Sequence, residues 1–277
     1  MALKDIVAFV DASPASDARL RLAVSLARAH DAHLVGVHVI AVPDVSPAMR
    51  TGMLDRVLKL HLAGTKEAAA ACEAKFHDLV NREGVRAEWR VARGEGAPVA
   101  SLHARYADLA IIGQIDPDWA SPIDPLPPDE VVLAAGRPLL VTPYAGHPGT
   151  VGERVLVAWN ASREAARAVN DALPLLRTAR TVTVIAINPA SSVDEHGAEP
   201  GADIALHLSR HGIRADVERH TSEDVVVADL LLSRAADLAA DLVVMGAYGH
   251  SRTRELVLGG VTQDMLRRMT VPVLMSH

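Results

Sequence analysis

Short apolar runs alternate with segments of helical periodicity along this 277-residue chain. The runs, such as 33–39 and 181–187, are rich in β-branched residues and apolar on both faces, which is typical of strands buried in a parallel sheet. Between them, apolar residues recur every three or four positions, as in 16–30 and 163–178, and predict amphipathic helices. This alternation predicts an α/β fold with helices on both faces of the sheet.

The whole pattern occurs twice, which indicates an internal duplication. The first half opens with DIVAFVDAS at 5–13 and the second with RVLVAWNAS at 154–162. Two later pairs of runs repeat in the same order: 107–113 with 240–246, and 137–142 with 271–276. The duplication predicts two tandem Rossmann-like domains, each a five-stranded, mostly parallel sheet flanked by helices.

The expected domains cover residues 1–145 and 152–277, joined by a linker at 144–152 that contains Pro148 and three glycines. The last strand of each domain, 138–142 and 272–276, would expose an apolar edge if it stood alone. We expect these two strands to pair antiparallel within the chain, as an intramolecular pseudo-dimer. Homodimerisation would then require another surface.

Composition narrows the class of protein. The net charge is −6 and is shared by both halves, so neither half is a basic nucleic-acid module. Cys72 is the only cysteine, which rules out an internal disulfide and fits a reducing cytosol. No charged leader precedes the first strand, and no apolar stretch approaches about 18 residues. We therefore expect a cytoplasmic protein without a membrane partner.

The common catalytic and metal-binding motifs are missing from the sequence. There is no P-loop, no Gly-x-Ser-x-Gly nucleophile elbow and no zinc-ligand spacing. His207 and His211 lie four residues apart on an expected helix, where a solvated surface pair is the simpler interpretation. We therefore assign no catalytic or metal-binding residue.

One glycine-rich motif points to a ligand. GAYGHSRTRELVLGGVT, at 246–262, follows an expected strand, and Gly246, Gly249 and Gly259 stand at the spacing Gly-x2-Gly-x9-Gly. Glycine tolerates positive φ and lets an anion approach backbone N–H groups closely. A helix starting near Gly259 would direct its free N–H groups and positive dipole end at a phosphate. The donors between the glycines, among them His250, Ser251 and Arg252, would add hydrogen bonds and positive charge.

The repeated strands and this motif resemble the universal stress protein family in its tandem two-domain form, with an adenine nucleotide alpha hydrolase-like fold. The resemblance covers nearly the whole chain and implies ATP, alone or with Mg²⁺, in the C-terminal domain. It departs from the family pattern at Gly260, where a small hydroxyl residue is usual, and at Asn160, where aspartate is common. With the adenine-side contacts that the resemblance implies, the expected site comprises Ala158, Trp159, Asn160, Ile187, Met245, Gly246, Gly249, His250, Ser251, Arg252, Gly259, Gly260, Val261 and Thr262.

The first half has lost the motif. After Gly113 the second glycine is missing, and the segment 114–130 is rich in prolines, which lack a backbone donor, and in acidic residues, which repel phosphate. Asp11 still stands where the family has its aspartate. We therefore expect the N-terminal domain to be a degenerate, structural or regulatory copy.

Three functions remain open at this point. The first is a nucleotide-binding stress or regulatory protein that signals to a protein partner not identified by the sequence. The second is a slow ATP hydrolase, for which Glu255 and Asp264 are the nearest carboxylates, although neither has a distinctive spacing. The third is a scaffold that binds no nucleotide. Trp159 would either stack on the base, block it, or fill the core.

Overall fold

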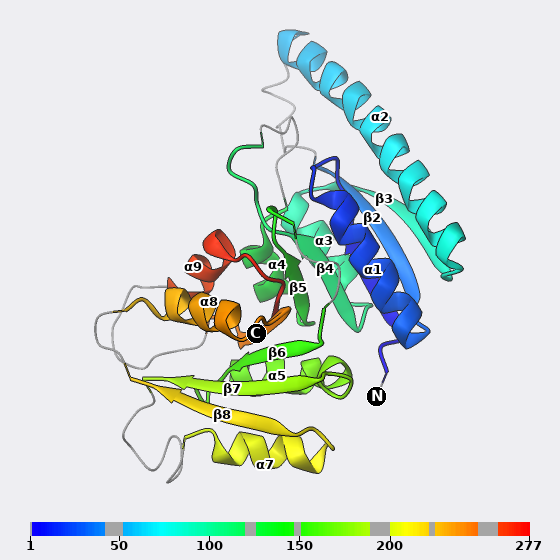
Figure 1. Ribbon diagram of the computed structural model, residues 1–277. Helices are drawn as coiled ribbons and strands as arrows, with labels where there is room; N and C mark the ends of the chain where they lie inside the picture. Colours follow the sequence, from blue (N-terminus) through cyan, green and yellow to red (C-terminus); the bar gives the residue numbers. More distant parts are fainter. Residues whose placement is uncertain are drawn as a thin grey trace.

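Two domains share a single ten-stranded sheet in the computed structural model (Figure 1). The structure describes residues 2–41, 52–119, 126–146, 151–188, 200–221, 225–248 and 260–277, and of 52–63 the backbone alone. The strands are β1 (Asp5–Phe9), β2 (His33–Ala41), β3 (Ala87–Gly94), β4 (Leu109–Gly113), β5 (Leu139–Thr142), β6 (Arg154–Ala158), β7 (Thr181–Ile187), β8 (Ala215–His220), β9 (Leu242–Gly246) and β10 (Val273–Ser276). The helices are α1 (Ser16–His30), α2 (Gly52–Glu83), α3 (Gly96–Ala104), α4 (Pro128–Ala135), α5 (Arg163–Leu176), α7 (Ala202–Arg210), α8 (Val227–Asp237) and α9 (Gly260–Arg268).

The strand order is β3-β2-β1-β4-β5-β10-β9-β6-β7-β8, so each half has the same order and the two halves meet at β5 and β10. Pairing within each half is parallel, whereas β10 pairs antiparallel with β5, Leu274 opposite Leu140. The expected pairing of the two final strands is therefore confirmed. Strand Val273–Ser276 is buried along its length because the other domain covers its outer edge.

Two apolar layers cover the sheet, one on each face. Residues of α1, α2, α5 and α7 pack on one face, and residues of α3, α4, α8 and α9 pack on the other. This is the doubly covered sheet that the apolar runs predict. Helix α2 is the longest element, and its N-terminal part runs well past the sheet (Figure 1).

Most element boundaries match the sequence prediction to within two residues. Helix α1 covers 16–30 as expected, and α5 ends at Leu176, two residues before its predicted end. The sequence patterns located four strands of the expected five in each half. The fifth strands are β3 and β8, which lie at the two edges of the sheet and carry mixed, half-exposed residues rather than an apolar run.

An aspartate just before the fourth strand of each domain fixes the first strand in place. The Asp241 carboxylate accepts hydrogen bonds from the backbone N–H groups of Gly152, Glu153 and Arg154 at 3.1, 3.0 and 2.9 Å. In the first domain, Asp108 accepts from the N–H groups of Lys4 and Asp5 at 2.7 and 3.2 Å. Both domains therefore contain this contact between an aspartate carboxylate and the backbone at the start of the first strand. In the second domain, the contact also holds Gly152 at the end of the linker.

Asp241→Asn should lower the free energy of unfolding by about 1 kcal/mol, since the amide NH₂ would replace the oxygen that accepts from the N–H of Glu153. Urea unfolding followed by circular dichroism measures the change. Asp216→Asn, at an exposed position on strand β8, is the matched control and should change stability by less than about 0.5 kcal/mol. Equal stability of the two variants would show that the backbone contacts of Asp241 contribute little.

Candidate functional site

The strand order places a crevice at the same point in each domain. From the first strand of each half, the chain adds two strands on one side, β2 and β3 or β7 and β8, and then returns to add the next strand on the other side, β4 beside β1 and β9 beside β6. In open α/β sheets, ligands bind beyond the carboxyl ends of the strands at such a switch point. The two candidate sites therefore lie next to β4 and β9.

The expected site residues that the structure describes lie at the carboxyl ends of three neighbouring strands and in the first turn of one helix. Ala158, Trp159 and Asn160 follow one another at the end of β6, and Ile187 ends the neighbouring β7. Met245 and Gly246 end β9, which pairs with β6 on its other side. Gly260, Val261 and Thr262 form the first turn of α9. Gly249, His250, Ser251, Arg252 and Gly259 lie outside the described residues.

A hydrogen bond joins the turn after β9 to the start of α9. The backbone N–H of Tyr248 donates to the Thr262 hydroxyl oxygen at 3.1 Å, and Thr262 is 3% exposed. Thr262 therefore fixes the turn against the helix rather than presenting itself to solvent. Positive φ occurs in this turn at Tyr248 (φ 56°), not at Gly246.

Gly246 has a packing role that the sequence did not indicate. A Cβ added there would lie 2.5 Å from the backbone nitrogen of Ala165 and 2.7 Å from the carbonyl carbon of Glu164. The first turn of α5 thus occupies the space beside Gly246, which the motif interpretation left to an anion. Because a larger side chain would displace this helix, a substitution at Gly246 would test packing as well as ligand binding.

Glu164 is a buried carboxylate that sequence analysis missed. It stands in the first turn of α5 beside Gly246, is 3% exposed, and accepts a hydrogen bond from Arg163 Nε at 2.5 Å. Burial acts to raise the pKa of Glu164, but hydrogen bonds from Arg163, its own N–H and Ser162 outweigh burial and lower the pKa. Glu164 is therefore ionised, and the Arg163 guanidinium offsets its charge near the turn.

Trp159 and Tyr248 belong to opposite apolar layers of the sheet. Trp159 is half-buried and packs against the core on the α5 and α7 face, which favours the core-filling interpretation over stacking on a base. Tyr248 packs against the other core, where burial and the nearby Asp129 carboxylate of α4 raise its pKa. The turn after β9 therefore lies close to the N-terminal domain.

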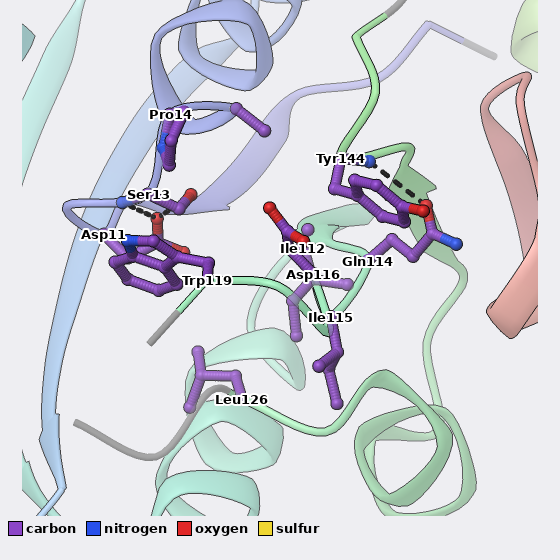
Figure 2. A pocket seen from close by; sticks show the side chains of 12 residues that line it. Asp11, Ser13, Pro14, Ile112, Gln114, Ile115, Asp116, Trp119, Leu126 and Tyr144 are labelled. Carbon is purple, nitrogen blue, oxygen red and sulfur yellow. Dashed lines mark hydrogen bonds between the residues drawn. The ribbon is translucent and has the colours of Figure 1, made fainter. Parts of the chain in front are cut away.

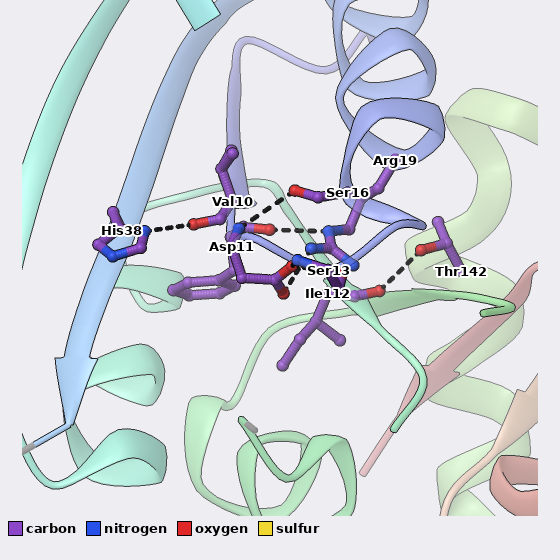
Figure 3. A network of polar contacts seen from close by, with 9 residues as sticks. Val10, Asp11, Ser13, Ser16, Arg19, His38, Ile112 and Thr142 are labelled. Atoms are coloured by element: carbon purple, nitrogen blue, oxygen red, sulfur yellow. Dashed lines mark hydrogen bonds and ion pairs between the residues drawn. The ribbon is translucent and has the colours of Figure 1, made fainter. Parts of the chain in front are cut away.

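The N-terminal crevice is occupied by a side chain of its own domain (Figure 3). Arg19, on α1, is 2% exposed; its Nε donates to the carbonyl of Phe9 at 2.8 Å, and its Nη2 lies 2.6 Å from Asp11 Oδ2. The Nη1 atom lies 2.0 Å from where a Cβ on Gly113 would stand. Gly113, the counterpart of Gly246, thus makes room for a guanidinium.

Both carboxylate oxygens of Asp11 take part in this network. Its Oδ1 accepts hydrogen bonds from the N–H and hydroxyl of Ser13, while Arg19 binds Oδ2. Burial acts to raise the pKa of Asp11, yet the Arg19 charge and the Ser13 hydrogen bonds lower it overall. Asp11 therefore already has an internal partner, which sequence analysis did not identify. Comparing the repeats offered a signal, since Ala168 stands where the first half has Arg19.

The remaining space in the N-terminal crevice is small. Trp119 lies beside Asp11 and Ser13, and Tyr144 lies over Gln114 (Figure 2). The free volume among these residues is about 30 Å³, room for a water molecule but far below the several hundred Å³ of a typical ligand site. The described part of this crevice does not hold a nucleotide as it stands.

A sequence profile described as the universal stress protein family matches residues 2–115 and again residues 152–277. The chain belongs to the universal stress protein family. Both matches fall on the two halves of the sheet, so the tandem arrangement and the fold class expected from the repeats are confirmed.

Similar proteins carry the same family name. A universal stress protein of Archaeoglobus fulgidus has the same fold, with a TM-score of 0.71 and 16% identity over 98% of this chain and 95% of that one. A putative universal stress protein of Pseudomonas aeruginosa matches with a TM-score of 0.58 and 16% identity, over 99% and 93% of the two chains. Universal stress protein Slr1230 of Synechocystis is 40% identical over 70 residues, which is 24% of this chain and 22% of that relative's length.

None of the described helices is long and apolar enough to span a bilayer. The described residues also contain no group of three or more His, Cys, Asp or Glu side chains arranged to hold a metal ion. His207 and His211 face each other with ring centroids 4.7 Å apart, and Arg177 Nη2 lies 3.3 Å from His211 Nδ1. Burial, His207 and Arg177 lower the pKa of His211, which favours the neutral form of this imidazole.

Proposed function

We propose that this universal stress protein binds ATP in its C-terminal domain and acts as a cytoplasmic stress-response regulator whose nucleotide occupancy is sensed by a protein partner. The observation that carries the proposal is the Tyr248–Thr262 contact, which holds the turn after β9 against the first turn of α9. The contact sets the start of α9 beside the strand end, and free N–H groups at a helix start are suited to phosphate.

The adenine end of the proposed site relies on Asn160. Its Oδ1 accepts a hydrogen bond from the N–H of Ser162 at 3.2 Å, and the residue is exposed. The amide NH₂ faces no acceptor in any described hydrogen bond, so it is free to donate to a ring nitrogen of adenine. A carboxylate at this position would accept a hydrogen bond from the base, whereas the NH₂ group of Asn160 donates one. The side chain can therefore still bond the base, with the opposite direction of donation.

The phosphate end combines favourable and unfavourable groups. Backbone N–H groups at the start of α9 favour an anion, and Arg163 offsets the carboxylate of Glu164 beside Gly246. Since the described residues contain no metal-binding cluster, Mg²⁺ would be brought by the phosphates themselves. Gly249, Gly259 and the donors between them remain predicted contacts.

Equilibrium binding of labelled ATP to the purified chain, with a product assay on the same sample, tests the proposal. We expect about one ATP per chain. In the N-terminal crevice, the Arg19 side chain fills the space and forms an ion pair with Asp11. Accumulation of ADP would indicate a hydrolase, and undetectable binding would favour the scaffold. A stoichiometry near two would contradict the one-site assignment.

Asn160→Ala should weaken ATP binding about fivefold to tenfold, the loss of about one hydrogen bond to the base. Asn170→Ala is the matched control, because Asn170 is exposed on α5 and bonds only its own helix, at the carbonyl of Ala166. The dissociation constants come from the same titration. Equal affinity in the two variants would remove Asn160 from the site.

A further inference from the structure

Gln114 bridges the two domains. It follows β4 in the N-terminal domain and is 7% exposed. Its Oε1 accepts a hydrogen bond from the N–H of Tyr144 at 3.1 Å, and its Nε2 donates to the carbonyl oxygen of Leu266, in α9 of the other domain, at 2.9 Å. The two partners fix the orientation of the carboxamide. A flipped group would place its NH₂ against the N–H of Tyr144 and its oxygen against the carbonyl oxygen of Leu266.

The acceptor of this bond belongs to the C-terminal end of a short helix. The last four carbonyl groups of an α-helix have no partner within the helix, and Leu266 is one of them in α9. A helix of nine residues is not stable by itself, so its position depends on tertiary contacts. Within its own domain, α9 is held by buried Met265 and by the ion pair from Arg268 to Asp229 at 2.6 Å. Gln114 supplies the cap from across the domain boundary.

Each domain donates a hydrogen bond to the C-terminal end of the other domain's final helix. A glutamine of the N-terminal domain bonds α9, and an arginine of the C-terminal domain bonds the residue after α4. The carbonyl of Gly136, just after α4, accepts from Arg167 Nη2 of the C-terminal domain at 2.6 Å. Arg105, from the N-terminal domain itself, donates to the carbonyl of Ala134 at 3.2 Å. Ala247 stands where the second half would need a glutamine, and its methyl group cannot donate. Gln114 is therefore specific to α9, the helix whose first turn belongs to the proposed phosphate site.

We propose that Gln114 is a positioning residue for the C-terminal nucleotide site: by capping α9 from the N-terminal domain, it holds the first turn of α9 in place against the turn after β9. This inference rests on the proposed ATP site. It gives the N-terminal domain a part in the binding of nucleotide by the C-terminal domain. Loss of the cap loosens α9 and the Thr262–Tyr248 contact at its other end.

The first test requires no ligand. Gln114→Glu keeps the acceptor for Tyr144, removes the donor to Leu266 and places negative charge at the negative end of the α9 dipole. Gln114→Met removes both bonds without adding charge. In the full-length chain, amide hydrogen exchange over 260–268 should become about tenfold faster in both variants, with that of α4 unchanged. Arg105→Ala, the matched control, should affect α4 and spare α9.

Unchanged protection of α9 in both Gln114 variants, or an equal loss over the whole chain, would overturn the capping role. The second test is titration of the same full-length proteins with labelled ATP. Both Gln114 variants should bind about tenfold more weakly at unchanged stoichiometry, and Arg105→Ala should bind as the unaltered chain does.

The two tests separate this inference from the function on which it rests. If the unaltered chain binds no ATP, the proposed function and the positioning role both fail, while hydrogen exchange still decides whether Gln114 caps α9. If the unaltered chain binds ATP and the Gln114 variants bind it equally well despite a loosened α9, the positioning role alone is wrong.

Discussion

Expressed alone, residues 150–277 are expected to dimerise or aggregate rather than to remain a soluble monomer. The reason lies at the centre of the sheet, where β10 pairs with β5 and its residues Val273, Leu274 and Met275 are at most 1% exposed. Removing the first domain uncovers this apolar edge together with the unpaired backbone groups of β10. The fragment also loses the Gln114 cap of α9 and the partner of Arg167 at Gly136.

Sedimentation equilibrium at several concentrations measures the mass of the fragment, and the full-length chain is the control. A dimer through β10 would replace the lost antiparallel partner with a second copy of the same strand. A fragment that stays monomeric at all concentrations, and unfolds at the same urea concentration as the full chain, contradicts the covered-edge account.

Arg19→Met is expected to destabilise the N-terminal domain by about 3 kcal/mol, the lower end of the cost of breaking a buried ion pair. The lower end applies because the Asp11 side chain is 45% exposed, so water solvates part of the abandoned carboxylate. The variant also leaves the carbonyl of Phe9 without its donor. Urea unfolding measures the loss.

A matched control and a double variant sharpen this measurement. Arg21→Met alters an exposed arginine on the same helix and should change stability by less than about 0.5 kcal/mol. Arg19→Met combined with Asp11→Asn should recover part of the loss, since both charges are then removed. If Arg19→Met proves as stable as Arg21→Met, the ion pair contributes nothing measurable.

The fold could be predicted from the sequence because each domain is built from repeated apolar strands. Buried runs such as 107–113 leave few alternatives to a parallel sheet, and their recurrence at 240–246 fixes the duplication. The edge strands β3 and β8 were harder to locate, because half-exposed strands carry mixed residues that resemble loops and helix surfaces.

The candidate site was predictable only in part. Sequence motifs place Gly246 and Asn160 at strand ends, because chain direction and strand order follow from the repeat. They do not reveal that Arg19 is buried, because arginine on an amphipathic helix normally lies in solvent. They also do not reveal that Gly246 is needed for close packing of α5, or that Gln114 contacts a residue 152 positions away. Such contacts depend on how helices pack across the sheet.

The antiparallel junction of β5 and β10 has a genetic consequence. A homodimer built from one such domain through the same edge would be encoded once, so each substitution would appear in both of its halves. In this chain the two halves mutate independently, and an arginine can close one crevice while alanine stands at the matching position of the other, as Arg19 and Ala168 do. Fusion of the halves thus lets one crevice diverge from the other, while the pairing of β5 with β10 still requires both halves.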